Sequence, residues 1–378
     1  MKKIRRIGFL ILFLLLSSSS TYTQLQKIKT EVHSEYDALF TRFSGWTGAD
    51  GDYSVALSDN LTLWLYSDTW VGKVRANRHV DSTMINNSVA LQYGKDPLTA
   101  RVEFFYGRIK DGKPTALITP ADGRGWFWLY HGILTKKGLY LFLMQIDKTA
   151  DDGFQHIGVW LGHVANPHDR PSRWRLTQHK IPFGRFSAQG DTLFGSALLK
   201  DGNFIYIYGT DEDVENGWYH RKHMVVARAP EENFADFDQW RFYTNGQWRS
   251  DYRKASRICD NIANEYSVSY QPALSKYVLV YTENGLSKNI VLRVATTPFG
   301  VWSIPTIVYQ CPEAAWHEKI VCYAAKAHPS LSTKPDELVL TYIASSSDFF
   351  HMTGDARLYR PRFLRLKLSP RNGEKVNR

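Results

Sequence analysis

The most constraining feature of the sequence is a hairpin pattern that recurs five times. In each copy, two apolar-rich runs flank a short turn rich in Asp, Asn, Gly, Lys, Pro or Ser, which is typical of a β-hairpin. The five hairpins span residues 53–66, 129–144, 193–208, 266–281 and 327–343. Their starts lie roughly 60 to 75 residues apart, which leaves room for two further strands in each repeat. Four strands per repeat in a radial array predict an all-β fold, a five-bladed β-propeller.

One propeller can account for most of the chain. A sandwich of two sheets is the alternative fold, but it does not explain the recurrence. The strongest helical candidate, residues 230–237, is short. We therefore expect a single propeller domain over residues 24–368, followed by a basic tail at residues 369–378.

The first 23 residues predict a secretory signal peptide. Basic residues at positions 2, 3, 5 and 6 precede an apolar stretch over residues 7–16, and small and polar residues follow it. This apolar stretch is too short to cross a bilayer, and no later segment is apolar enough to do so. We expect a secreted or periplasmic protein with no membrane span.

The net charge of +10 does not indicate a nucleic-acid partner. Four of these charges belong to the signal peptide and several to the tail, so the body of the chain is only mildly basic. No run of Lys and Arg interleaved with aromatic residues suggests a nucleic-acid track. We expect a monomer whose partner is a poly- or oligosaccharide, for reasons that follow.

The three cysteines leave the covalent framework open. Cys311 and Cys322 either form a disulfide in an oxidising compartment or remain thiols, and Cys259 stays unpaired in both cases. Their spacing matches no structural zinc site. No cluster of His, Asp and Glu has a metal-binding spacing either, so we predict no cofactor, and a calcium ion in the channel is unsupported.

Two carboxylates stand at mirror-image positions around the first hairpin. Folding the chain about Asp59 places Asp50 opposite Asp68 at one edge of a sheet. Folding the other hairpins in the same way places further acids just outside their paired strands, namely Asp147, Asp191 with Asp211 or Glu212, and Glu265 with Glu283. The repeat therefore predicts an acidic channel mouth.

Closely spaced carboxyl groups are what the hydrolysis of a glycosidic bond requires. Opposed residues on antiparallel strands have Cβ atoms about 4.5–5.5 Å apart, and two like charges so close raise one pKa. We therefore predict three catalytic residues: Asp50 as nucleophile or base, and Asp68 and Glu265 as alternative acids. The structural alternatives are strand-end capping for the aspartates and an arginine partner, Arg253 or Arg257, for Glu265.

Aromatic residues make up 14% of the chain, and those near loops can stack on sugar rings. The candidate substrate-binding residues are Trp46, Trp70, Asn87, Trp126, Trp128, Asp147, Asp211 and His328, with Trp218 and Tyr219 as further aromatic candidates. We expect His328 to point into the channel, where it would orient a carboxylate or bind a metal or water. The alternatives are tryptophans packed between blades and a purely structural histidine.

Several segments resemble a known group of proteins. Residues 45–54 (GWTGADGDYS), 63–70 (LWLYSDTW) and 85–88 (INNS) carry the likeness, and segments 264–312 and 327–332 extend it over nearly all of the mature chain. The chain is similar to secreted bacterial five-bladed propellers long catalogued as domains of unknown function. That group is similar to endo-D-arabinofuranosidase propellers and, more remotely, to arabinanase and β-xylosidase propellers.

The resemblance implies a glycosidase site at the channel mouth. Asp50 and Asp68 match the paired first-blade aspartates, Glu265 the later-blade acid, and His328 the channel histidine. One departure is Ser67, which stands where the group has a glycine before the second aspartate. We therefore predict an exported glycoside hydrolase acting on a poly- or oligosaccharide, with an arabinofuranoside as one candidate. The alternative is a carbohydrate-binding propeller without catalysis.

Overall fold

The computed structural model describes residues 27–150, 153–187, 190–213 and 220–369. Over these residues the chain is nearly all β, with two short α-helices, α1 (Ser34–Phe40) and α2 (Phe349–Gly354). No helix in these ranges is long and apolar enough to cross a membrane. The predicted signal peptide lies outside the described residues, as does the predicted tail beyond its first residue.

The strands form five antiparallel sheets of four or more strands and one sheet of three. The first sheet contains β3 (Tyr53–Ser58), β4 (Leu61–Tyr66), β7 (Ser88–Tyr93) and β8 (Arg101–Phe105). The second contains β9 (Trp126–Thr135), β10 (Gly138–Lys148), β11 (Phe154–Val164) and β12 (Leu176–Lys180). The third contains β13 (Thr192–Asp201), β14 (Phe204–Glu212), β15 (Lys222–Pro230), β16 (Arg241–Thr244) and β17 (Gln247–Arg249), with β18 (Cys259–Asp260) paired to β15.

The remaining sheets involve both ends of the described chain. The fourth contains β19 (Tyr266–Gln271), β20 (Lys276–Thr282), β21 (Asn289–Ala295) and β22 (Thr306–Gln310). The fifth contains β23 (Ile320–Ala327), β24 (Glu337–Ser346), β25 (Pro361–Ser369) and β1 (Lys27–Val32). The three-stranded sheet contains β2 (Ser44–Ala49), β5 (Thr69–Arg75) and β6 (Arg78–Ile85).

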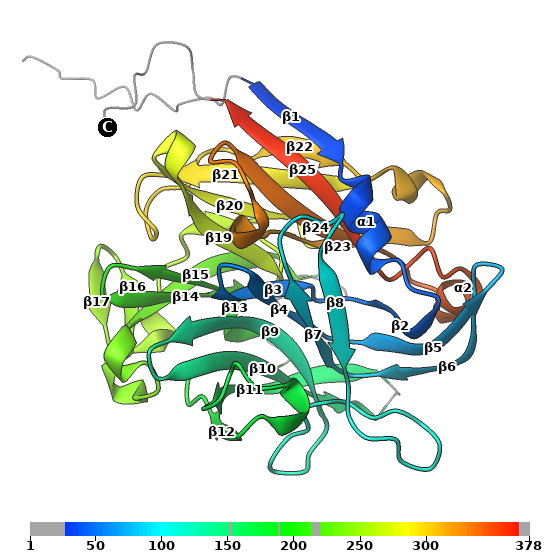
Figure 1. Cartoon of the computed structure of the whole chain (residues 1–378). Helices are drawn as coiled ribbons and strands as arrows, with labels where there is room; N and C mark the ends of the chain where they lie inside the picture. Colours follow the sequence, from blue (N-terminus) through cyan, green and yellow to red (C-terminus); the bar gives the residue numbers. More distant parts are fainter. Residues whose placement is uncertain (1–26, 151–152, 188–189, 214–219, 370–378) are drawn as a thin grey trace, which may run out of the picture.

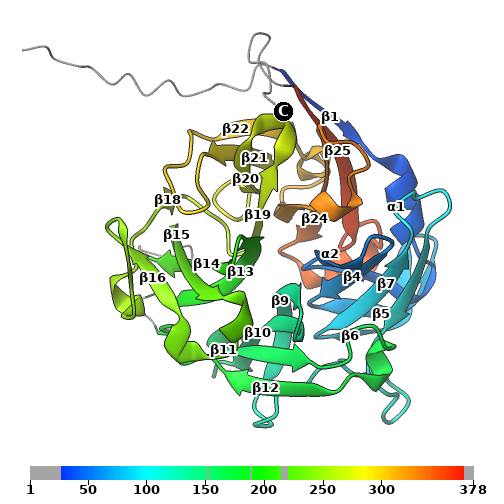
Figure 2. The same ribbon diagram turned by 60° about the vertical axis from the view of Figure 1, so that its left-hand side comes forward.

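The sheets are arranged around a common centre (Figures 1 and 2). Each predicted hairpin is present as the first two strands of one of the five larger sheets, and the first strands of successive sheets contact one another. The first strand of the described chain, β1, pairs with the last, β25, from Lys27 opposite Ser369 to Val32 opposite Leu364. This pairing joins the two ends of the chain within one sheet and protects its outer edge.

The sheets pack face to face through apolar side chains. Strand β10 is buried without interruption from Gly138 to Ile146, because neighbouring sheets cover both of its faces. Phe142 on β10 lies so close to Gly195 on β13 that a Cβ at position 195 would overlap its ring. Gly195 also has a φ of +114°, which strains other residues. This packing fixes the inner strands and hence the loops at their ends.

Candidate functional site

A cavity of about 930 Å³ lies where the ends of the inner strands meet. Its wall is built by strands of the second, third and fifth sheets, by the loops that precede β19 and follow β20, and by the connections between β2 and β3 and between β4 and β5. Five of the lining residues are carboxylic acids, Asp50, Asp68, Asp191, Glu212 and Glu265. The acidic side chains expected at the channel mouth therefore line one partly open cavity.

Asp50 and Asp68 are opposed, as the mirrored register predicts. The amide N–H of Asp50 donates to the carbonyl of Asp68 at 3.1 Å, and the N–H of Ser67 donates to the carbonyl of Asp50 at 3.0 Å. This pair of residues joins two ladders of the same register, β2 with β5 and β3 with β4. Gly51 makes the approach possible, because its φ is +87° and a Cβ there would lie 2.9 Å from the Ser67 nitrogen.

Two tyrosines hold the Asp50 carboxyl group. The hydroxyls of Tyr323 and Tyr359 donate to Asp50 Oδ2 at 2.7 and 2.8 Å, while the buried Oδ1 has no partner among the described residues. Burial, followed by the negative charges of Asp68 and Glu265, raises the pKa of Asp50 to about 8. One oxygen is thus anchored by two hydroxyl groups, and the other is left without a hydrogen-bond partner in the described part of the chain.

Asp68 is held in a similar way. The indole Nε1 of Trp128 donates to Asp68 Oδ1 at 2.9 Å, and Asn86 Nδ2 donates to the same oxygen at 3.3 Å. Burial raises the pKa of Asp68 to about 6, although both hydrogen bonds oppose this effect. Because Asp50 and Asp68 interact, their pKa values belong to the pair, and both are raised above the ordinary value of an aspartate.

Glu265 forms an ion pair with a lysine rather than with either arginine considered from the sequence. Lys326 Nζ lies 3.1 Å from Glu265 Oε1 and also donates to the carbonyls of Gly51 and Ala324. The Lys326 side chain is only 1% exposed and lies 4.4 Å from the centre of the Tyr53 ring. Lys326 therefore ties Glu265 to the turn that carries Asp50.

The wall across the cavity is a second acidic pair with basic partners. Asp191 Oδ2 lies 2.7 Å from His156 Nδ1, and Glu212 lies 3.3 Å from Lys222 Nζ. Of the two partners left open for Asp191 by the sequence, Glu212 is the opposed one, since its N–H donates to the Asp191 carbonyl at 2.8 Å. These charges are compensated, unlike those of Asp50 and Asp68.

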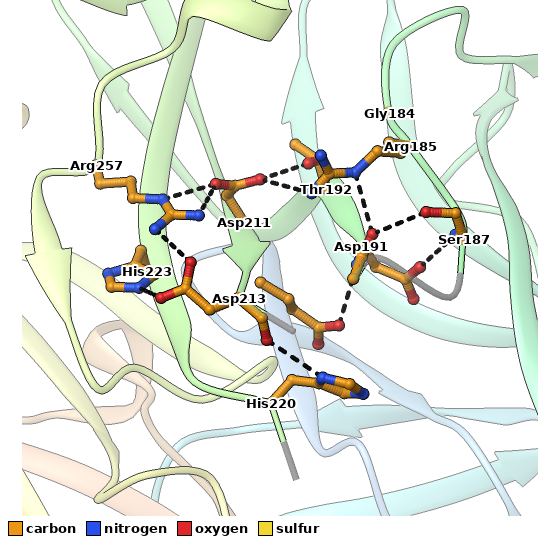
Figure 3. Close-up of polar contacts among 12 residues, drawn as sticks. Gly184, Arg185, Ser187, Asp191, Thr192, Asp211, Asp213, His220, His223 and Arg257 are labelled. Atoms are coloured by element: carbon orange, nitrogen blue, oxygen red, sulfur yellow. Dashed lines mark hydrogen bonds and ion pairs between the residues drawn. The ribbon is translucent and has the colours of Figure 1, made fainter. Parts of the chain in front are cut away.

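A charged network supports this wall from behind (Figure 3). Arg257 bridges Asp211 and Asp213 at 2.7 and 2.6 Å. His223 Nε2 lies 2.7 Å from Asp213 Oδ2, and Thr192 donates to Asp211 Oδ1 at 2.6 Å. Because side chains alternate along β14, Glu212 faces the cavity while Asp211 faces this network.

Comparison with known proteins gives a family. The family described as "Domain of unknown function (DUF5005)" matches residues 33–368. The chain belongs to the DUF5005 family. No curated protein matches the sequence.

Solved structures share the fold of this DUF5005 protein. A protein of Bacteroides ovatus, provisionally described as a hydrolase, is 18% identical, with 92% of each chain covered and a TM-score of 0.71. Zg3597, a family 117 glycoside hydrolase of Zobellia galactanivorans, is 12% identical, with 92% of each chain covered and a TM-score of 0.52. At such identities the likeness shows a common fold, and the chemistry must be argued from the site itself.

Among the predicted aromatic residues that the structure describes, Trp128 lines the cavity, and Trp46, Trp70 and Trp126 lie elsewhere. Trp46 stacks on Phe104 with ring centres 4.4 Å apart in a buried cluster, and Trp126 packs against the main core. Trp70 lines a separate pocket that is described below. Trp218 and Tyr219 lie outside the described residues. The alternative that tryptophans pack between sheets therefore holds for Trp46 and Trp126.

The three predicted polar ligands, Asn87, Asp147 and Asp211, also lie outside the cavity wall of the DUF5005 protein. Asn87 is buried and ties the backbone of Ile118 and Phe127 through its amide. Asp147 pairs with Arg124 at 2.7 Å, and Asp211 faces the network of Figure 3. The predicted opposition of Glu265 and Glu283 is wrong, because the β19–β20 register places Thr282 opposite Glu265. Glu283 instead accepts a hydrogen bond from Asn289.

His328 is a core residue instead of a channel residue. Its Nδ1 lies 2.7 Å from Ser54 Oγ and its Nε2 lies 2.8 Å from Thr341 Oγ1. Burial lowers its pKa well below the usual value, and the Lys326 charge acts in the same direction. A neutral imidazole with both nitrogens bonded serves to hold β3 against β24, which is the structural alternative.

The described residues offer no obvious metal site and no disulfide. No group of three or more His, Cys, Asp or Glu side chains among them could hold a metal ion. Cys259, Cys311 and Cys322 are buried free thiols.

Proposed function

We propose that this protein is an exported glycoside hydrolase built on a five-bladed β-propeller, and that Asp50 and Asp68 are its catalytic pair. The observation that carries this proposal is the pair of opposed, half-buried carboxyl groups, both with a raised pKa, in the wall of a cavity of about 930 Å³. Each group has one oxygen anchored by neighbours. Glycosidic hydrolysis needs one carboxylic acid and one carboxylate at the same bond, and the pair supplies both near neutral pH.

The reaction breaks the bond between the anomeric carbon and the glycosidic oxygen. The protonated carboxyl group gives its proton to the leaving oxygen, while the ionised one attacks the anomeric carbon or activates a water that does so. Water supplies the hydroxyl of the new reducing end, and its other proton returns to the pair. Opposed positions on neighbouring strands place the carboxyl groups close together, which favours the nucleophilic route and retention of configuration.

We assign Asp50 as the nucleophile or base and Asp68 as the acid. The two phenol hydroxyls on Asp50 Oδ2 favour its ionised form and leave Oδ1 free. Glu265 is a poor acid because the Lys326 ammonium pairs with it; its charge instead raises the pKa of Asp50. The pKa of Asp50, about 8, lies above that of Asp68, about 6, so this assignment requires a proton to pass from Asp50 to Asp68 when the substrate binds.

The five larger sheets, each begun by an inner strand, support the blade count that we propose. An arabinofuranoside substrate rests on the resemblance of residues 45–54 and 63–70 to the endo-D-arabinofuranosidase propellers. Export rests on the first 23 residues of the sequence. A carbohydrate-binding propeller would share the cavity, but it would not require two uncompensated carboxyl groups at its centre.

The test is hydrolysis of a panel of plant, algal and bacterial cell-envelope glycans, including arabinans, by the purified protein. We expect one of them to release sugars, and we expect Asp50→Asn and Asp68→Asn each to reduce the rate at least a thousandfold. Asp147→Asn is the matched control, since Asp147 pairs with Arg124 away from the cavity, and its rate should stay within twofold of the wild type. Azide should restore turnover to the variant that lacks the nucleophile. Activity of both variants within a few-fold of the wild type would refute the assignment.

A further inference from the structure

A second pocket, of about 460 Å³, lies beside the active-site cavity and is lined by Trp70, His79, Asp81, Ser82, Met84, Phe349 and Thr353. It is formed where α2 packs against the hairpin of β5 and β6, at the right of Figure 1. None of these residues lines the catalytic cavity. The pocket combines aromatic rings with hydroxyl and carboxylate groups, which is the composition that sugars require.

Three rings form the apolar wall of this pocket. Trp70 stacks on His79 with ring centres 4.7 Å apart and planes 18° apart. Phe349 lies 5.8 Å from Trp70 at 35°, and it remains 50% exposed whereas Trp70 is only 4% exposed. Phe349 thus presents an accessible ring face that is fixed from behind by the buried indole, and the apolar face of a sugar can stack on it.

Two buried polar atoms at the back of the rings lack protein partners. Neither Trp70 Nε1 nor His79 Nε2 has a hydrogen-bond partner among the described residues. Thr47 donates to the Trp70 carbonyl at 3.3 Å, so its oxygen is left to accept from His79 Nδ1 at 3.4 Å. This arrangement leaves Nε2 without a proton, and burial keeps the ring neutral by lowering the pKa of His79 to about 4. The indole N–H is therefore an unused donor and the imidazole Nε2 an unused acceptor beneath the pocket lining, a combination that matches a hydroxyl group, which both accepts and donates.

The strands connect this pocket to the catalytic pair. Trp70 lies two residues after Asp68 in the chain. Its partner across the β5–β6 ladder is Met84. Two residues after Met84 comes Asn86, whose amide donates to Asp68. Asp68 lies in the bend just before β5 and Trp70 is the second residue of that strand, so their Cα atoms are at most about 7 Å apart. A saccharide chain leaving the cavity past Asp68 would therefore reach the three rings within a short distance.

We propose that this pocket is a second saccharide-binding subsite. One saccharide chain would place a glycosidic bond between Asp50 and Asp68 and further sugar units in this pocket. That the bound chain is the substrate rests on the proposed function, but binding itself can be measured without catalysis. The proposal implies a substrate several sugar units long, because shorter saccharides could fill only one of the two spaces.

The experiment uses the full chain with Asp50→Asn as background, in native gels that contain arabinan, arabinogalactan, xylan or carrageenan. Phe349→Ala removes the exposed ring, and Phe350→Ala is the matched control, since Phe350 is 84% exposed on the same helix and does not line the pocket. We expect at least one polysaccharide to retard the background and the control, with the affinity of Phe349→Ala about threefold to tenfold weaker. His79→Phe keeps a ring but removes the acceptor, and we expect it to weaken retardation as well.

The outcomes separate this subsite from the proposed catalysis. Equal retardation of the Phe349→Ala and Phe350→Ala proteins, or no retardation by any polysaccharide, overturns the subsite. If the wild type hydrolyses a glycan while Phe349→Ala binds it normally, the subsite fails and the enzyme stands. If retardation depends on Phe349 but no glycan is cleaved, the enzyme fails and the subsite stands. Unchanged thermal melting of both alanine variants shows that the fold is intact.

Discussion

The hydrogen bond from Tyr323 to Asp50 gives the sharpest prediction, because it tests the charge state of the proposed catalytic pair directly. The Tyr323 hydroxyl donates to Asp50 Oδ2 at 2.7 Å and stabilises the ionised carboxylate. Tyr323→Phe removes this donor and leaves the ring in place. We therefore expect the pKa of Asp50 to rise above its value of about 8, while the pKa of Asp68, whose donors are unchanged, should move far less.

The size of the shift follows from the geometry. A hydrogen bond to a charged group contributes about 1.5–3 kcal/mol, and one pKa unit corresponds to about 1.36 kcal/mol. The Tyr359 hydroxyl remains on the same oxygen and compensates in part, so we expect an upward shift of about one unit. In the active enzyme, the alkaline limb of the pH dependence of kcat/KM should move up by the same amount.

The measurement is carbon NMR of the protein labelled at the aspartate carboxyl carbons and titrated without substrate, so it does not depend on knowing the glycan. Tyr342→Phe is the control, since Tyr342 is a buried tyrosine that donates to Glu313 at 2.8 Å, outside the cavity wall. A titration of Asp50 that is unchanged or shifted downward in Tyr323→Phe would refute the assigned electrostatics of the pair. So would an equal upward shift in the control.

Two further predictions concern stability. Because the pKa of Asp50 is raised in the folded state, its stabilising contribution is present below the unfolded pKa of about 4 and is lost as the pH rises through about 8. Asp50→Asn should thus melt at a higher temperature than the wild type at pH 9, and this difference in melting temperature should vanish near pH 4. Calorimetry measures both values, and a difference that does not change with pH would contradict the prediction. Lys326→Met leaves Glu265 without its cation at 3.1 Å and should lower the free energy of unfolding by about 3 kcal/mol. Urea denaturation measures this loss, and Lys200→Met, which removes a more exposed ion pair with Glu231, is the control. Its free energy of unfolding should fall by less than about 1 kcal/mol, and equal losses in the two variants would count against a buried role for Lys326.

Features set by local pairing could be predicted from the sequence. The five hairpins are present because alternating apolar residues and short turns determine both the strands and their register. The opposition of Asp50 and Asp68 is a consequence of the same symmetry about residue 59. The predicted register is wrong where the turn is less regular. Pro272–Leu274 forms a 3-10 turn, and Glu265 therefore lies opposite Thr282 instead of Glu283.

Features set by distant segments could not be predicted in the same way. Tyr323, Tyr359 and Lys326 act on the first hairpin from more than 270 positions away. A register shift between Tyr323 and Lys326, with Ala324 at a φ of +59°, gives the two side chains their positions, and no residue pattern marks such a bulge. Whether a tryptophan is a ligand or part of the core likewise depends on which sheet covers it, as Trp46 and Trp128 show.

The position of the catalytic pair has a physical basis in the way the strands change sheets. Asp50 and Asp68 lie between two ladders, since β2 and β5 belong to one sheet and β3 and β4 to another. The two backbone hydrogen bonds at this junction preserve the pairing while the chain turns at Gly51 and Asp52, whose φ values are +87° and +52°. Within a continuous strand pair, these side chains would face a packed neighbouring sheet. At the junction they line a cavity instead, so the fold can keep two carboxyl groups opposed and half-buried yet within reach of a ligand.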